Sequence, residues 1–127
     1  MQGKHLYEYA VIRVVPKVER EEFLNVGVIL FSKKGKFIKM LYHLNKEKLR
    51  LFSDELDIEL IEKTLESFEK IASGKKEGGI IAGLDIPERF RWITAERSSC
   101  VQTSRPHAGF TEDPESTINR LFQELVL

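Results

Sequence analysis

An arginine within an apolar segment is the first residue of chemical interest, and its partner decides what it can do. Arg13 lies in residues 6–15, a run rich in tyrosine, alanine, valine and isoleucine. If that run is a central strand, the guanidinium must be paired, and Glu22 is the expected carboxylate. The sequence therefore predicts either an ion pair that pins the first loop or a cationic binding pocket. Asn25, at the entrance of the next apolar segment, can cap backbone groups there.

A second polar cluster lies at residues 89–105, where arginines and hydroxyl groups accumulate. Guanidinium forks beside hydroxyls suit the recognition of a phosphate or a carboxylate. The same residue types suit the satisfaction of helix ends and strand edges, so this alternative stays open. A single pocket drawn from both clusters would use Arg13, Glu22, Asn25, Arg97 and Gln102.

Other catalytic patterns are missing from the sequence. His5, His43, His107 and Cys100 are scattered singly, without the spacing of a zinc site, so we expect no metal. The glycines of residues 78–83 lack the Lys-Ser/Thr pair of a nucleotide-binding loop, and we expect no cofactor. A lone cysteine in a strand is typical of a small core residue. The catalytic residues, if the protein is an enzyme, stay unknown.

The formal net charge is zero, with 20 basic and 20 acidic residues, but the layout is uneven. Residues 54–69 are mostly acidic. Residues 33–50 are mostly basic, which predicts either a solvated hairpin facing the acidic segment or a stripe that contacts the phosphates of a nucleic acid. Nucleic-acid binding is disfavoured, because the aromatic residues that stack on bases are not interleaved. The basic residues are Lys33, Lys34, Lys36, Lys39, Lys46, Lys48 and Arg50.

Four strands are expected to position these residues. Residues 6–15, 25–32 and 36–43 have the composition of strands and predict an antiparallel meander, with a short turn before the third. Apolar residues fall on both faces of the first, which indicates a central strand. Gly27 within the second predicts a bulge or a close approach by another backbone. Residues 99–104 predict a fourth, late strand.

Two main helices are expected to complete the fold. Asp57 caps an amphipathic helix that Gly74 ends, and Asp113 followed by Pro114 begins the last helix. Pro87 opens a short third helix, and residues 73–79 predict a surface loop. The sequence thus predicts one α+β domain over residues 1–127, with an antiparallel sheet of about four strands packed on two main helices in two layers.

No signal-peptide pattern or membrane-spanning run is visible in the sequence. One cysteine cannot form an internal disulfide, which suits a reducing compartment. We therefore expect a cytoplasmic protein that does not bind a membrane.

Taken together, the motifs of this chain resemble the bacterial domain-of-unknown-function family 3037. The resemblance rests on residues 7–16 (YEYAVIRVVP), Arg20, residues 22–28 (EFLNVGV), residues 89–91 (RFR), Arg97-Ser98, Gln102 and residues 111–114 (TEDP). At Glu21 the chain departs from the glycine that is common in the family. The resemblance implies no catalytic residues, and carries over Arg13, Glu22, Asn25, Arg97 and Gln102 as motif positions only. It also implies a link to HipA-like serine/threonine kinases, beside which members are often encoded.

Three functional hypotheses follow. The favoured one is a non-catalytic interaction or accessory protein whose partner is a protein, with a nearby HipA-like kinase as the candidate. The alternative is a small enzyme or a binder of a phosphate or carboxylate ligand that uses the Arg, Glu, Asn and Gln pocket. The second alternative is nucleic-acid binding through residues 33–50. The sequence leaves the oligomeric state open.

Overall fold

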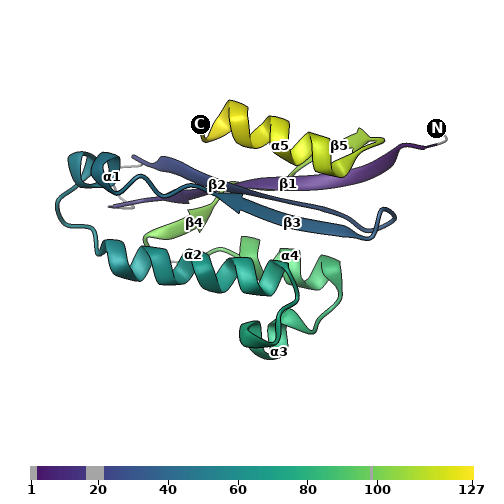
Figure 1. The fold of residues 1–127 in the computed structure, drawn as a ribbon, viewed down its shortest axis with the longest axis horizontal. Coiled ribbons are helices and arrows are strands. Elements are labelled where there is room, and N and C mark those ends of the chain that lie inside the picture. Colours follow the sequence, from purple (N-terminus) through teal and green to yellow (C-terminus); the bar gives the residue numbers. More distant parts are fainter. Residues whose placement is uncertain (1–2, 17–21, 98) are drawn as a thin grey trace.

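The computed structural model describes residues 3–16, 22–97 and 99–127, and its first three strands form the expected meander (Figure 1). β1 (His5–Val14), β2 (Leu24–Ser32) and β3 (Phe37–Tyr42) pair antiparallel in chain order. Their valine, isoleucine and aromatic side chains suit a pleated, buried surface. The prediction of these three strands is confirmed.

The other edge of β1 is shared by two short strands. β4 (Val101–Thr103) pairs antiparallel with residues 12–14 of β1, and β5 (His107–Thr111) pairs antiparallel with residues 5–9. Between them, the Val11 N–H donates to Ser104 Oγ at 2.9 Å, and the Ser104 N–H donates to the Val11 carbonyl at 2.8 Å. The hydroxyl of Ser104 thus continues the ladder where the chain bends. In the described part of the chain the sheet has five strands, one more than predicted.

Capping residues fix the helix boundaries. The side chains of Asp57 and Asp113 accept hydrogen bonds from backbone N–H groups of the first turn, at 3.1 and 3.2 Å, so both predicted caps are confirmed. Gly74, at φ 71°, follows α2 where the helix was expected to end. The helical elements are α1 (Lys46–Phe52), α2 (Ile58–Ala72), the 3-10 turn η2 (Lys76–Gly78), α3 (Gly79–Ala82), α4 (Ile86–Thr94) and α5 (Pro114–Leu125).

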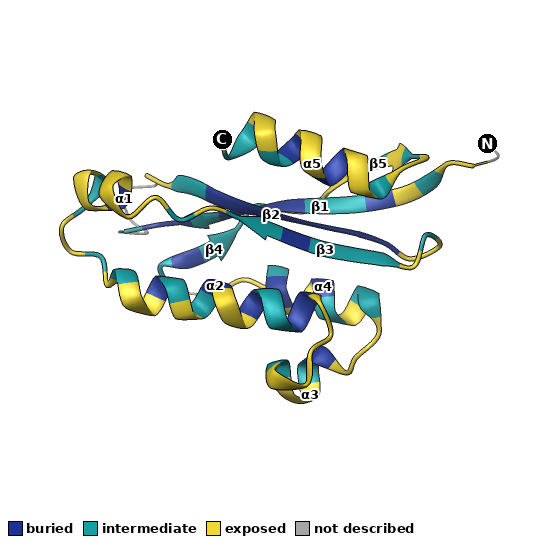
Figure 2. Ribbon diagram, viewed as in Figure 1, coloured by how far each residue is buried: buried dark blue, intermediate teal, exposed yellow. Residues whose placement is uncertain are grey.

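Helices cover both faces of the sheet (Figures 1 and 2). α2 and α4 pack on the face that carries Ala10 and Ile12, and α5 packs on the face that carries Val28 and Leu30. The predicted two-layer arrangement is therefore wrong, and the domain has three layers. The physical reason is that β1 and β2 are apolar on both faces, so each face needs a cover.

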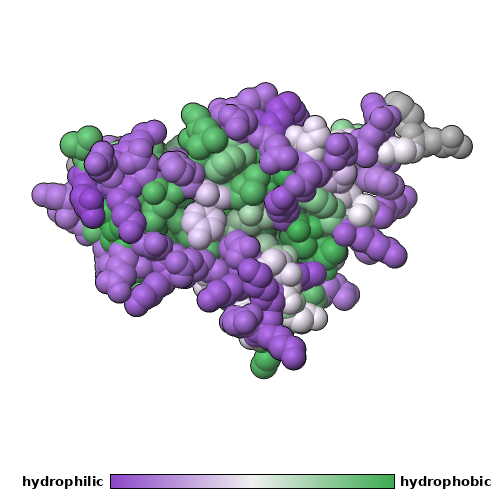
Figure 3. Space-filling view, viewed as in Figure 1, coloured by the Kyte–Doolittle hydropathy of each residue, from purple (hydrophilic) through white to green (hydrophobic). Residues whose placement is uncertain are grey.

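Three elements lie where none was expected. α1 occupies part of the basic segment, α3 follows the predicted loop, and β5 follows the late strand. The predicted loop at residues 73–79 contains η2. Among the described residues, no helix is long and apolar enough to cross a membrane. The face in Figure 3 is mostly hydrophilic, with apolar side chains gathered between the sheet and its helices.

Candidate functional site

Three of the five candidate residues lie side by side across the sheet. Arg13 on β1 is in register with Asn25 on β2 and with Gln102 on β4. Residues directly opposite in antiparallel strands have side chains on the same face. We call this set of three the Arg13 row. It lies on the α5 face, because the alternate residues Ile12 and Val14 belong to the core under α2 and α4.

A β-bulge in β2 sets the register of this row. Ile12 is opposite Gly27, whereas Arg13 is opposite Asn25, so β2 carries one extra residue at this point. Gly27 also lies close to β3: a Cβ there would be 2.8 Å from the carbonyl oxygen of Leu41. Both expectations for Gly27, a bulge and a close backbone approach, are confirmed.

Arg13 contacts an aromatic ring. Its guanidinium lies 4.0 Å from the centroid of the Phe23 ring, a cation–π arrangement. Burial lowers the pKa of Arg13, and its Nε is buried without a hydrogen-bond partner. The ion pairs recorded among residues 3–16, 22–97 and 99–127 do not join Arg13 to Glu22. The predicted pair is thus replaced by the contact with Phe23.

Asn25 connects the row to the end of the last helix. Its Nδ2 donates to the carbonyl oxygen of Leu125 at 3.1 Å, while its Oδ1 is buried without a partner. A small cavity of about 230 Å³ lies next to it, lined partly by His43 and Lys48. Gln102 donates through Nε2 to the Ser99 carbonyl at 3.0 Å, which braces the start of β4.

Arg97 has a structural role on the other face. Its Nη1 donates to the Ile93 carbonyl at 2.5 Å, and its Nη2 donates to the Trp92 carbonyl at 2.8 Å. The guanidinium also lies 5.0 and 5.2 Å from the ring centroids of Phe68 and Trp92. Burial lowers its pKa. These carbonyls belong to the last turn of α4, where intrahelical donors are lacking, so Arg97 caps the helix.

The five predicted residues therefore do not form one pocket. Arg97 and Gln102 both border a cavity of about 820 Å³ at the β4 edge. The guanidinium of Arg97, however, is bound to α4 and stacked on rings of α2 and α4, away from the Arg13 row. Glu22 lies at an exposed position before β2.

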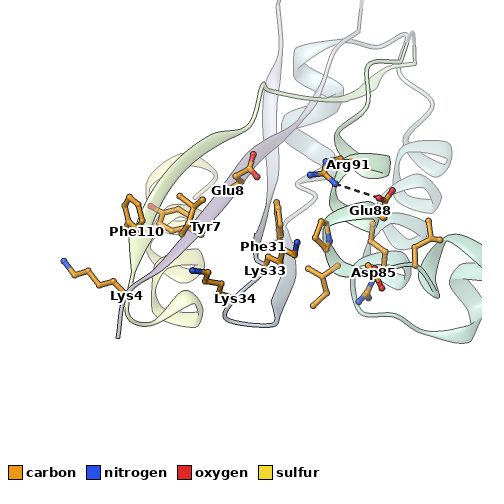
Figure 4. Close-up of a pocket in the computed structure, with 15 residues that line it drawn as sticks. Lys4, Tyr7, Glu8, Phe31, Lys33, Lys34, Asp85, Glu88, Arg91 and Phe110 are labelled. Carbon is orange, nitrogen blue, oxygen red and sulfur yellow. Dashed lines mark ion pairs between the residues drawn. The ribbon is translucent and has the colours of Figure 1, made fainter. Parts of the chain in front are cut away.

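A larger cleft, of about 990 Å³, escaped the sequence reasoning. It lies between the N-terminal half of β1, the β2–β3 turn, β5 and the start of α4 (Figure 4). Leu6 and Phe110, which are in register, are 50% and 70% exposed there. Phe110 was a weak signal in the sequence, an aromatic residue outside every predicted element. We call this site the lysine cleft, for Lys4, Lys33 and Lys34.

Lys4 directly precedes β1, and Lys33 and Lys34 lie in the β2–β3 turn (Figure 4). Within the described ranges, none of them takes part in a recorded ion pair. On the opposite wall Arg91 pairs with Glu88 at 3.9 Å. The cleft also contains Glu8, Asp85 and Arg89, so its five basic and three acidic side chains give an excess of two positive charges.

The basic segment does not form one continuous stripe. Lys39 pairs with Glu115 of α5 at 2.5 Å, and Lys46 pairs with Glu62 of α2 at 3.1 Å. The second pair agrees with the expected contact between basic and acidic segments. β3 separates the turn lysines from those of α1 by roughly 20 Å, the length of a six-residue strand. This separation weakens the nucleic-acid hypothesis.

Among the described residues, Cys100 and Tyr42 have raised pKa values. Within the described residues, no group of three or more His, Cys, Asp or Glu side chains could hold a metal ion. Desolvation, and to a lesser extent Asp57, raises the pKa of Cys100, so its thiol stays protonated at neutral pH. Desolvation, with Glu66, Glu69 and Glu62, raises the pKa of Tyr42.

The comparisons with known proteins agree with the motif resemblance. The model of a family described as "Protein of unknown function (DUF3037)" matches residues 9–126 of the 127-residue chain. No curated protein and no solved structure gives a significant match. The matched range includes every candidate residue of both clusters and most of the lysine cleft.

Proposed function

Because the chain belongs to the DUF3037 family, whose function is unknown, we propose its role from its own surface. It is a non-catalytic interaction protein that binds an acidic, partly apolar segment of a protein partner in the lysine cleft. The observation that carries this proposal is the combination of two exposed apolar side chains, Leu6 and Phe110, with three lysines that take part in no recorded ion pair among the described residues, all in one cleft.

The apolar side chains supply the affinity. Leu6 and Phe110 together expose roughly 200 Å² of apolar surface, whose burial is worth about 5 kcal/mol before the costs of association. Two adjacent exposed apolar side chains with charged neighbours match the plan of a protein interface, which has an apolar centre and a polar rim. The lysines supply selectivity and a faster encounter, because an excess of positive charge attracts acidic segments and repels basic ones.

A HipA-like serine/threonine kinase encoded nearby is the partner that the family resemblance suggests. We place the encounter in the bacterial cytoplasm, a reducing compartment that suits a protein with the single unpaired Cys100. In this role the chain is an accessory or regulator of the kinase and performs no reaction itself.

The test is calorimetric titration of that kinase with the full chain and two charge-reversal variants. Lys34→Glu places an acid in the cleft and should raise the Kd by about tenfold, the equivalent of about 1.4 kcal/mol. Lys76→Glu makes the same change in net charge on η2, outside the cleft, and should leave the Kd unchanged. Absence of binding by the unmodified chain, or equal weakening by both variants, contradicts the proposal.

The Arg13 row supports a second candidate function, the binding of a small phosphate or carboxylate ligand. The specific observation is that Arg13 lies in register between two amide side chains, Asn25 and Gln102, with its Nε unpartnered. Thermal-shift measurements with inorganic phosphate and with citrate test it. Stabilisation of the unmodified chain that Arg13→Gln abolishes supports the ligand site, and no stabilisation by either anion contradicts it.

A further inference from the structure

The outer side of β5 is an open strand edge. In the described part of the chain β5 pairs only with β1, and β1 is the one element that packs extensively against it. The direction of its backbone groups follows from β1. The Leu6 carbonyl accepts a hydrogen bond from Ser32 on β2, whereas the Val11 carbonyl accepts one from Ser104 on the β4 side. The backbone N–H and carbonyl groups of even-numbered β1 residues thus point toward β2, and those of odd-numbered residues point toward β4 and β5.

This alternation fixes which groups of β5 are unpaired. The N–H and carbonyl groups of Tyr7 point toward β5, so those of its partner Gly109 point toward β1. The neighbours of Gly109, Ala108 and Phe110, must then point their N–H and carbonyl groups outward. Among the described residues, no recorded hydrogen bond uses these four groups. They form two donors and two acceptors in a row.

The side chains of β5 include none of the residues that protect strand edges. Edge strands are blunted by lysines, prolines, bulges or inward charges. The five residues of β5, HAGFT, include no lysine, carboxylate or proline, and their register with β1 has no break. The opposite edge differs, because β3 carries Lys39, which is paired with Glu115, and packs against α2. One edge is therefore protected and the other is open.

The open edge is held rigidly. The ring of Tyr7 lies over Gly109, where a Cβ would be only 2.7 Å from the tyrosine oxygen. Thr111 Oγ1 lies 2.7 Å from Thr117 Oγ1, which ties the end of β5 to α5. A preformed strand loses little conformational entropy when a further strand binds to it.

We propose that a second copy of this chain pairs with this edge, β5 against β5, antiparallel about a two-fold axis at Gly109. In this register Ala108 of each copy is opposite Phe110 of the other. The N–H and carbonyl groups of both residues point outward. This arrangement therefore forms four N–H···O bonds between the copies and uses every outward backbone group of the two β5 strands. A two-fold axis at Ala108 would instead place Phe110 opposite Pro106, which has no N–H to donate.

Side chains favour the same register. The exposed Phe110 ring packs over the small Ala108 of the second copy, and Leu6 borders this contact on each side. Antiparallel continuation of this register places Arg105 opposite Asp113, and diagonally next to Glu112, of the other copy. All three are exposed, and Arg105 has no recorded ion pair among the described residues. Opposite charges therefore meet twice across the interface.

The dimer extends the sheet from five strands to ten and keeps the two lysine cleft sites on the same side. A two-fold axis perpendicular to the sheet preserves its faces, so the lysines of both clefts lie on the same side of the dimer, while each Phe110 ring is shared between its cleft and the dimer contact. This inference does not depend on the proposed function, because it concerns the protein without its partner.

The experiment is sedimentation velocity of the full chain, alone, over a range of concentrations. We expect a species of twice 14.7 kDa. Ala108→Pro removes one outward N–H and leaves the β1 ladder intact, since proline is tolerated on an edge whose N–H faces solvent. It should weaken dimerisation at least tenfold, whereas Ala108→Ser, the matched control, should not. Circular dichroism of each variant confirms that it folds.

A charge swap tests the register independently of folding. Arg105→Glu should weaken the dimer, and adding Glu112→Arg to it should restore part of the lost affinity, because Asp113 stays acidic. A 14.7 kDa species at all concentrations, or a dimer insensitive to both Ala108→Pro and Arg105→Glu, overturns the proposal. Kinase binding that depends on Lys34 in a purely monomeric protein would overturn the dimer alone and leave the proposed function in place.

Discussion

Replacement of Arg97 by methionine separates its role as a helix cap from a role in ligand binding. Methionine keeps an unbranched, flexible stem but removes all five N–H donors. In the structure these donors hold the Ile93 and Trp92 carbonyls at 2.5 and 2.8 Å, and the cation lies over the rings of Phe68 and Trp92. The change thus removes two hydrogen bonds and two cation–π contacts at the end of α4.

The magnitude follows from these four contacts. Hydrogen bonds to charged groups contribute about 1.5–3 kcal/mol, and partial exposure of Arg97 reduces this to about 1 kcal/mol for each bond. Each cation–π contact adds about 0.5 kcal/mol. The free energy of unfolding should therefore fall by about 3 kcal/mol. With an unfolding entropy of about 2.1 cal/mol/K per residue over 127 residues, the Tm should drop by about 11 °C.

Thermal unfolding followed by circular dichroism measures this drop. Arg97→Lys keeps the positive charge but loses the planar guanidinium. Its Tm should therefore drop about half as much as that of Arg97→Met, by roughly 5 °C. A Tm within about 2 °C of the unmodified chain for Arg97→Met, together with a loss of phosphate or partner binding, would refute the cap and assign Arg97 to a ligand.

Two further changes test other parts of the structure. Gly27→Ala places a Cβ 2.8 Å from the Leu41 carbonyl oxygen, so the urea midpoint should fall by the equivalent of about 1–3 kcal/mol. Gly83→Ala, whose nearest contact is 3.4 Å, is the control and should change stability by less than about 0.5 kcal/mol. Cys100, with its raised pKa, should react with iodoacetamide at pH 7 more slowly than a free cysteine peptide, and faster alkylation would contradict its burial. Because the folded pKa is raised, the stability linked to this thiol is present below about pH 8.5 and is lost as the pH rises through the folded value.

Local signals in the sequence were enough to predict several elements. Asp57 and Asp113 mark helix starts because each cap bonds only to its own first turn. The meander is equally local, with a short turn between β2 and β3. α1 was missed although Asn45 caps it in the same way, accepting from the Lys48 N–H at 3.0 Å. Its lysines were interpreted as part of a charged hairpin.

Other features depend on contacts distant in sequence. β5 contains glycine and alanine, which have low strand propensity, and it is a strand because β1 and the Tyr7 ring hold it. The third layer could have been predicted, since a strand apolar on both faces needs two covers. The Arg13 row could not have been predicted, because it requires β4 to lie beside β1. Sequence patterns do not determine that strand order.

The position of β1 has a consequence for the order in which the protein is made and folds. β1 is the first strand in the described residues, yet its edge opposite β2 is completed by β4 and β5, about 90 to 100 residues later. The bond between Val11 and Ser104 spans 93 residues, and that between Asn25 and Leu125 spans 100. Non-local contacts of this kind slow folding. During synthesis, β1 to β3 leave the ribosome with one edge of β1 and one face of the sheet uncovered. The sheet is complete only when β5 has left the ribosome, and its second face is covered only when α5 follows.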